Sequence, residues 1–218
     1  MVETSLELSA RRRQALRRRG IRLEYARVAW NVVGSLVVLA AAVAARSVAL
    51  AGFGLDSLIE ILASTVVVWQ LKGTGNDREQ KALRLIGIAF MLLALYIAGQ
   101  SLLVLVTGFR PHTSVVGITW LALTALAMFA LAYGKTSTGR ALGNRVLQTE
   151  AHVTVIDGVL ASAVLVGLAL NAALGWWWAD PLAALVIVYY GLREGRAARA
   201  EAAEPSLARP FGKTGDSG

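Results

Sequence analysis

Residues 49–71 read ALAGFGLDSLIEILASTVVVWQL, an apolar stretch of the length that crosses a lipid bilayer, yet it contains Asp56 and Glu60. A third acid, Asp157, interrupts another apolar stretch farther along the chain. An ionised carboxylate near the bilayer centre costs at least about 2.5 kcal/mol on insertion scales, so such residues normally face a bundle interior and bind a positive charge. The three acids therefore predict a binding site or pathway for cations.

The composition of the chain is typical of a membrane protein. Its 218 residues are 56% hydrophobic and 17% charged, and the mean hydropathy is +0.57, whereas soluble domains contain about 25% charged residues. The formal net charge of +8 would indicate nucleic-acid binding in a soluble protein. Here the basic residues cluster between apolar stretches, where they set topology, so the lipid bilayer and not nucleic acid is the expected partner.

Six apolar stretches are long enough to form transmembrane helices. The expected spans are 28–45, 49–71, 85–107, 115–133, 146–174 and 176–192. Short segments rich in turn residues separate them, for example GKTSTGRALGN at 134–144. No stretch alternates long enough between apolar and polar residues to indicate a transmembrane strand. The predicted fold class is an all-α membrane protein with six transmembrane helices.

Basic residues also predict the orientation of these spans. They precede the first span, follow the sixth, and lie between the second and third and between the fourth and fifth, whereas the other connections hold only Arg46 and Arg110. By the positive-inside rule, both termini are predicted to be cytoplasmic. The tryptophans at 176–178 then fall at the outer membrane interface, where indole rings are enriched.

Three regions are expected along the chain. A basic cytoplasmic segment covers 1–21, the membrane domain covers 22–195, and a short tail covers 196–218, with a helical extension that gives way to disorder and no soluble C-terminal domain. No cleaved signal peptide is expected, because the first residues lack an apolar core. The Ala- and Arg-rich composition favours a bacterial plasma membrane as the location.

The spacing of the acids predicts how they meet. Asp56 and Glu60 are four residues apart, so their side chains leave one helix face about 6 Å apart along the axis. Asp157 is expected at a similar depth, and packing of the second span against the fifth would gather three oxygen donors for a small divalent cation. A role as partners of a buried arginine is disfavoured, because no Arg or Lys lies inside an expected span.

Two motifs resemble the cation diffusion facilitator (CDF) family. The sequence SVALAGFGLDSLIE at 47–60 is similar to the second transmembrane segment of that family, where small residues lead to a pair of metal-binding acids. Residues 147–192 are similar to its fifth and sixth segments, including the W-x-D-P sequence that ends at Pro181. The resemblance covers 21–195 and implies a CDF-like bundle that exports zinc or a related divalent ion in exchange for protons, as a homodimer and without a permanently bound cofactor.

The fourth ligand of the expected site is open. The fifth segment of that family presents an HxxxD motif, but here Val153 stands four residues before Asp157, and His152 is rotated by about 100° around the helix. Thr154 is a candidate for a weak fourth ligand. Glu150 lies two turns from Asp157, about 10 Å away, so it is expected at the cytoplasmic mouth of the site.

Two further acids have structural explanations at this point. Asp180 precedes a proline and is expected to cap the N-terminus of the sixth span, and Glu24 is expected to form an interfacial ion pair with Arg22 or Arg27.

Two functions remain open from the sequence. The first is a secondary transporter that exchanges a divalent metal for protons; the family resemblance favours zinc, and oxygen ligands also suit manganese, iron(II) and cobalt. The second is a non-transporting regulatory or scaffold subunit whose acids serve helix packing. An enzyme is not expected, because the chain lacks the HExxH and GxSxG motifs and has no second histidine near the acids.

Overall fold

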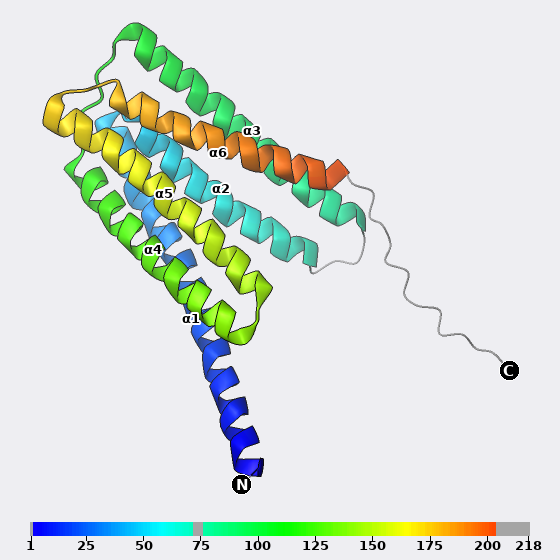
Figure 1. The fold of residues 1–218 in the computed structure, drawn as a ribbon. Coiled ribbons are helices and arrows are strands. Elements are labelled where there is room, and N and C mark those ends of the chain that lie inside the picture. Colours follow the sequence, from blue (N-terminus) through cyan, green and yellow to red (C-terminus); the bar gives the residue numbers. More distant parts are fainter. Residues whose placement is uncertain (1, 72–75, 204–218) are drawn as a thin grey trace.

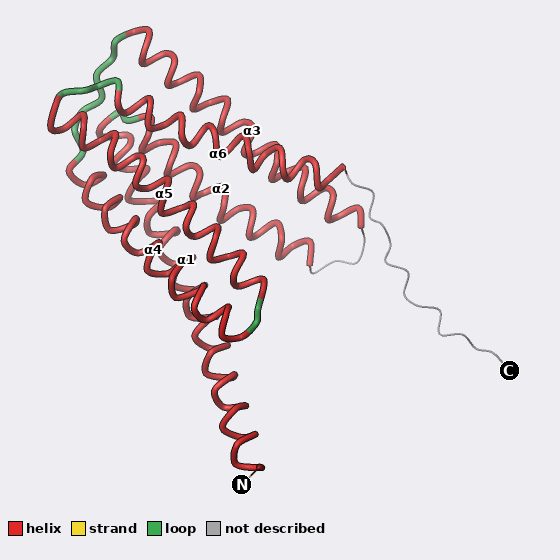
Figure 2. The backbone as a smooth tube through the Cα atoms, viewed as in Figure 1, coloured by secondary structure: helices red, strands yellow, loops and turns green. Residues whose placement is uncertain are grey.

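The computed structural model describes residues 2–71 and 76–203, which form a bundle of six helices (Figures 1 and 2). The helices are α1 (Val2–Ala45), α2 (Val48–Leu71), α3 (Asn76–Thr107), α4 (Val115–Leu142), α5 (Arg145–Leu174) and α6 (Ala179–Ala203). Over these residues the regular structure is entirely helical. The prediction of an all-α protein is therefore confirmed for the described part of the chain.

Within the described residues, four helices are long and apolar enough to cross a membrane. They lie within α1, α3, α4 and α5, over Arg11–Ala45, Leu83–Thr107, Val115–Leu142 and Glu150–Leu174. Large apolar side chains also cover their outward faces, among them Leu36, Val43, Leu95, Val106 and Leu126. Soluble proteins rarely expose apolar surface on this scale, so these faces suit contact with lipid. The chain is thus a multi-pass membrane protein.

Several helices extend beyond the expected spans. α4 passes through most of the expected 134–144 connection, because the hydroxyl groups of Ser137 and Thr138 donate to the Gly134 carbonyl and are satisfied within the helix. α4 ends only where Gly143 adopts a φ of 62°, which glycine tolerates. α1 likewise begins well before residue 28, and α6 continues to Ala203. Residues 204–218 of the expected tail lie outside the described residues.

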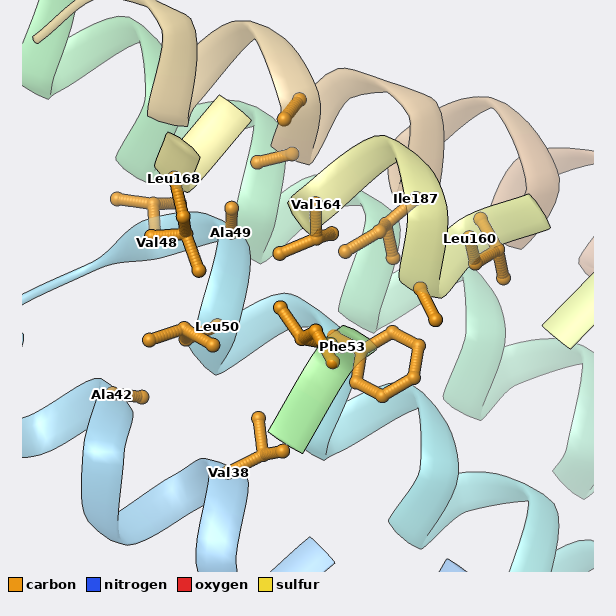
Figure 3. Close-up of a cluster of buried hydrophobic side chains, with 14 of the residues drawn as sticks. Val38, Ala42, Val48, Ala49, Leu50, Phe53, Leu160, Val164, Leu168 and Ile187 are labelled. Atoms are coloured by element: carbon orange, nitrogen blue, oxygen red, sulfur yellow. The ribbon is translucent and has the colours of Figure 1, made fainter. Parts of the chain in front are cut away.

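The helices pack as two close pairs with α2 between them. α3 lies along α6 and α4 lies along α5, while α1 packs against α2 and α4 (Figure 1). α2 contacts α1, α3, α5 and α6. A buried apolar core, including Val38, Leu50, Phe53, Val164 and Ile187, joins the helices (Figure 3). Its residues lie in the half of the bundle nearest the α1–α2, α3–α4 and α5–α6 connections. The buried ionic contacts lie in the other half, which holds the candidate site.

Candidate cation site

Small residues set the position of the acids on α2. A Cβ atom at Gly54 would lie 2.8 Å from the Leu39 side chain of α1, and one at Gly52 would lie 3.0 Å from Ile187 of α6. Real Cβ contacts are rarely this close, so glycine at these positions allows α2 to approach its neighbours. One turn further along, Asp56 is 7% exposed and faces the bundle interior.

The Arg27 side chain of α1 lies among the carboxylates of α2 and α5. Its Nη2 is 2.9 Å from Asp157 Oδ2 and 3.4 Å from Glu60 Oε2, while its Nη1 is 3.3 Å from Glu150 Oε2. The Arg27 Nε also donates to Asp157 Oδ2 at 3.0 Å. One turn away on α1, the Asn31 amide donates to Glu60 Oε2 at 3.3 Å. A single guanidinium thus connects three acids from two helices.

Asp56 lies in the same region but lacks a compensating charge. Among the described residues, no hydrogen bond or ion pair reaches its carboxylate. We call Asp56, Glu60, Glu150 and Asp157 the acidic cluster. When all four are ionised, they carry four negative charges, and the basic group that contacts them among the described residues is Arg27.

The expectation that the acids do not pair with a buried arginine is wrong, because Arg27 contacts Glu60, Glu150 and Asp157. Arg27 comes one residue before the expected first span, and Lys135 comes two residues after the expected fourth, but α1 and α4 continue as helices through both positions. Lys135 is fully buried, and its Nζ lies 2.8 Å from Glu24 Oε2 and 3.1 Å from Thr154 Oγ1. The prediction that Glu24 pairs with Arg22 or Arg27 is therefore also wrong, because Glu24 pairs with Lys135.

The structure also places Thr154 and Glu150, the two remaining ligand candidates on α5. The Thr154 hydroxyl accepts a hydrogen bond from Lys135 and donates one to the Glu150 backbone carbonyl at 2.8 Å, so neither bond is to a carboxylate of the acidic cluster. The Glu150 side chain is 40% exposed, as suits a residue at the mouth, yet it shares the Arg27 guanidinium with Asp157. His152 is exposed. It gives the cluster no ligand in this conformation.

The expected three-carboxylate metal shell is not assembled in this conformation. Among the described residues, no group of three His, Cys, Asp or Glu side chains is arranged to hold a metal ion. The Arg27 guanidinium lies where it contacts Glu60 and Asp157 at once. The guanidinium is a planar donor that can bind several carboxylate oxygens, and in this structure it is the cation that these carboxylates contact.

Asp180 caps a different helix from the one expected. It lies in α6 and is fully buried, and its carboxylate accepts from the Ser47 hydroxyl and from the backbone N–H groups of Val48 at 3.0 Å and Ala49 at 3.4 Å. These are first N–H groups of α2, which have no partner within their own helix. Asp180 therefore fixes the N-terminus of the helix that bears Asp56 and Glu60.

A cavity of about 810 Å³ lies apart from the acidic cluster, between α1, α2 and α3. Its lining is largely apolar, with Leu39, Leu55 and Ile97 among its residues, and it contains none of the four acids. Its chemistry gives no support to a cation site there, so the acidic cluster remains the candidate.

Comparison with known proteins supports the membrane character of the chain. No family model matches the sequence. The chain is 22% identical over 204 residues to Transmembrane protein 163 of Xenopus laevis, in an alignment that covers 88% of this chain and 72% of that protein. This similarity agrees with the apolar helices and indicates transmembrane helices in this chain.

Proposed function

We propose that the chain is a secondary transporter that moves a divalent metal cation, with zinc favoured, out of the cytoplasm in exchange for protons, and that the acidic cluster is its cation site. The charge balance of the cluster carries this proposal. Among the described residues, one guanidinium contacts the cluster of four carboxylates in a half-buried place, and no described residue forms a hydrogen bond or ion pair with Asp56. Such intramembrane acids mark ion pathways.

The chemistry of the cluster suits exchange between a metal and protons. A carboxylate must lose its proton before it coordinates a metal ion, so the two kinds of cation compete for the same oxygen atoms. Asp56 and Glu60 on α2 and Asp157 on α5 would bind the metal, and the exposed Glu150 would lie at the cytoplasmic side. The cluster joins two helices, so its occupation is coupled to how α2 and α5 sit against each other.

The proposed function agrees with the resemblance to the CDF family, and we extend the proposal to membership of that family and to a homodimeric assembly. In this proposal, all six helices cross the membrane. The connections 46–47, 108–114 and 175–178 then lie outside, and the stacked rings of Trp176 and Trp178 lie at the outer interface.

A second candidate is a non-transporting regulatory or scaffold subunit. It is favoured by the ion pairs themselves, because Arg27 joins α1 to α2 and α5, and Lys135 joins α4 to Glu24 of α1. Structural acids need about one counter-charge each, since an unpaired buried charge is strongly destabilising. Among the described residues, the cluster holds more acids than basic groups, and this favours the transporter.

Transport by the purified protein separates the two functions. Liposomes that hold the protein, with an internal zinc dye and an internal pH dye, should take up Zn²⁺ and release protons in the opposite direction. An imposed proton gradient should change the rate of Zn²⁺ movement. Empty liposomes and liposomes with an unrelated multi-pass protein serve as controls. Zn²⁺ and proton signals equal to those of empty liposomes would favour the scaffold.

The six-span topology predicts which ends of the helices face outside. Single cysteines at Arg46, Thr113 and Ala141, all exposed positions, can be introduced into this cysteine-free chain. In intact cells, an impermeant maleimide should label the first two and spare the third. Arg46 and Thr113 flank α2 and α3 together, so labelling on opposite sides would show that only one of these two helices crosses the membrane.

A further inference from the structure

We propose that the Arg27 guanidinium is a tethered counter-cation of the acidic cluster, that a divalent ion must displace it from Glu60 and Asp157 in order to bind, and that Glu150 holds it after displacement. The inference rests on the proposed function and adds a competitor within the chain for the same site. Three described contacts carry it, one to each of these acids.

The three acids differ in depth around the guanidinium. The side chain of Asp157 is 10% exposed, that of Glu60 is 23% exposed and that of Glu150 is 40% exposed. Arg27 itself is 13% exposed at its side chain. The guanidinium therefore reaches from the most accessible acid to the least accessible one. Its deepest contact is the one that a metal between α2 and α5 would need.

Displacement requires a rotation of the side chain and leaves α1 in place. Nη1 already contacts Glu150, so the guanidinium can keep that contact while Nη2 and Nε leave Asp157 and Glu60. The Asn31 amide donates to Glu60 from the same helix and can hold that carboxylate in either arrangement. Glu150, near the surface, then pairs with Arg27 alone.

Charge explains why the two cations exclude each other. At about 4 Å, a guanidinium and a divalent ion repel strongly in a poorly solvated site. With the metal on Asp56, Glu60 and Asp157 and the guanidinium on Glu150, the four carboxylates hold three positive charges. The two cations are then apart, and each lies against its own carboxylates. Arg27 therefore lowers the affinity for the metal and provides the means of its release.

The first test measures Zn²⁺ binding to the full chain in lipid nanodiscs by titration calorimetry. Arg27→Gln should bind Zn²⁺ at least about tenfold more tightly than the wild type, because its competitor is gone. Arg27→Lys, which keeps the charge and loses the planar fork, should lie between the two. Arg22→Gln removes the same charge from an exposed position of the same helix and should change little.

The second test asks whether Glu150 acts through Arg27. Glu150→Gln should weaken Zn²⁺ binding at least about fivefold in the wild-type background, since the displaced guanidinium loses its place, but less than about twofold in the Arg27→Gln background. A direct ligand would weaken binding by the same factor in both backgrounds. Added methylguanidinium should compete with Zn²⁺ in Arg27→Ala and have little effect on the wild type.

The outcomes separate this inference from the proposed function. Absence of Zn²⁺ binding in both the wild type and Arg27→Gln would overturn the proposed function together with this inference. Zn²⁺ binding by the wild type that stays equal or becomes weaker in Arg27→Gln would overturn only the role of Arg27. If Arg27→Gln does not fold, Arg27→Lys decides, because an affinity equal to that of the wild type would contradict displacement.

Discussion

Asp157→Asn is expected to reduce Zn²⁺ affinity at least about a hundredfold, which corresponds to about 2.7 kcal/mol, and to abolish coupled proton flux. Asp157 is the most buried of the three acids on the guanidinium, which it shares with Glu60 of α2. The amide keeps the size of the side chain but removes a negative charge that the metal needs. Calorimetry and the liposome assay measure the two effects, and Asp56→Asn and Glu60→Gln should act in the same direction.

His152→Ala is the matched control for Asp157→Asn. His152 is the histidine of α5, lies five residues from Asp157 and is exposed, so its loss should leave Zn²⁺ affinity within about twofold. In the wild type, affinity should also fall progressively below about pH 6, because protonated carboxylates do not coordinate metal. Undiminished binding by Asp157→Asn, or an affinity that stays constant from about pH 5 to 8, would contradict exchange on these carboxylates.

Asp180→Ala is expected to destabilise the folded protein by about 3 kcal/mol or more. Three donors, the Ser47 hydroxyl and the N–H groups of Val48 and Ala49, would lose a charged acceptor at a fully buried position. Asp180→Asn keeps one acceptor oxygen, so it should reduce the free energy of unfolding by less than Asp180→Ala does. Denaturant unfolding in mild detergent measures the difference.

Ser47→Ala provides the comparison for this effect. It removes one of the three donors and also the bond from Leu50 N–H to the Ser47 hydroxyl, and it leaves the carboxylate with the N–H groups of α2. Its cost should be smaller than that of Asp180→Ala. Loss of less than about 0.5 kcal/mol in Asp180→Ala would show that the cap contributes little. The Zn²⁺ affinity of the folded fraction should not change, because Asp180 does not contact the acidic cluster.

The sequence predicted the helices well because apolar length is a local property. The stretches around Asp56 and Asp157 are helical as expected, and the acids of α2 and α5 come to one guanidinium. The ends of helices were harder to predict. A search for apolar stretches stops at the first charged residue. α4 nevertheless continues through Lys135 to Leu142, and the buried charge of Lys135 is paired with Glu24.

The partners of the charged groups could not be predicted from the sequence for a related reason. Local spacing suggests that Glu24 pairs with Arg22 or Arg27 and that Asp180 caps α6, since these groups are near along the chain. In the folded protein, contacts between distant helices replace both, with Lys135 on Glu24 and Asp180 on α2. The sequence does show a mismatch in charge, because the apolar stretches contain acids but no Arg or Lys. A counter-charge for these acids therefore has to come from residues outside the stretches or from a bound cation.

The buried pair of Glu24 and Lys135 constrains how the chain is made in the cell. Glu24 and Lys135 are 111 positions apart in the sequence, so α1 is synthesised before its partner on α4 exists. Arg27 lies three residues along the same helix and can neutralise Glu24 during that time. In the folded protein, Lys135 contacts Glu24, and Arg27 contacts Asp157 and Glu150. We therefore expect an exchange of partners during biogenesis, in which Glu24 is next to Arg27 until α4 is made and then pairs with Lys135.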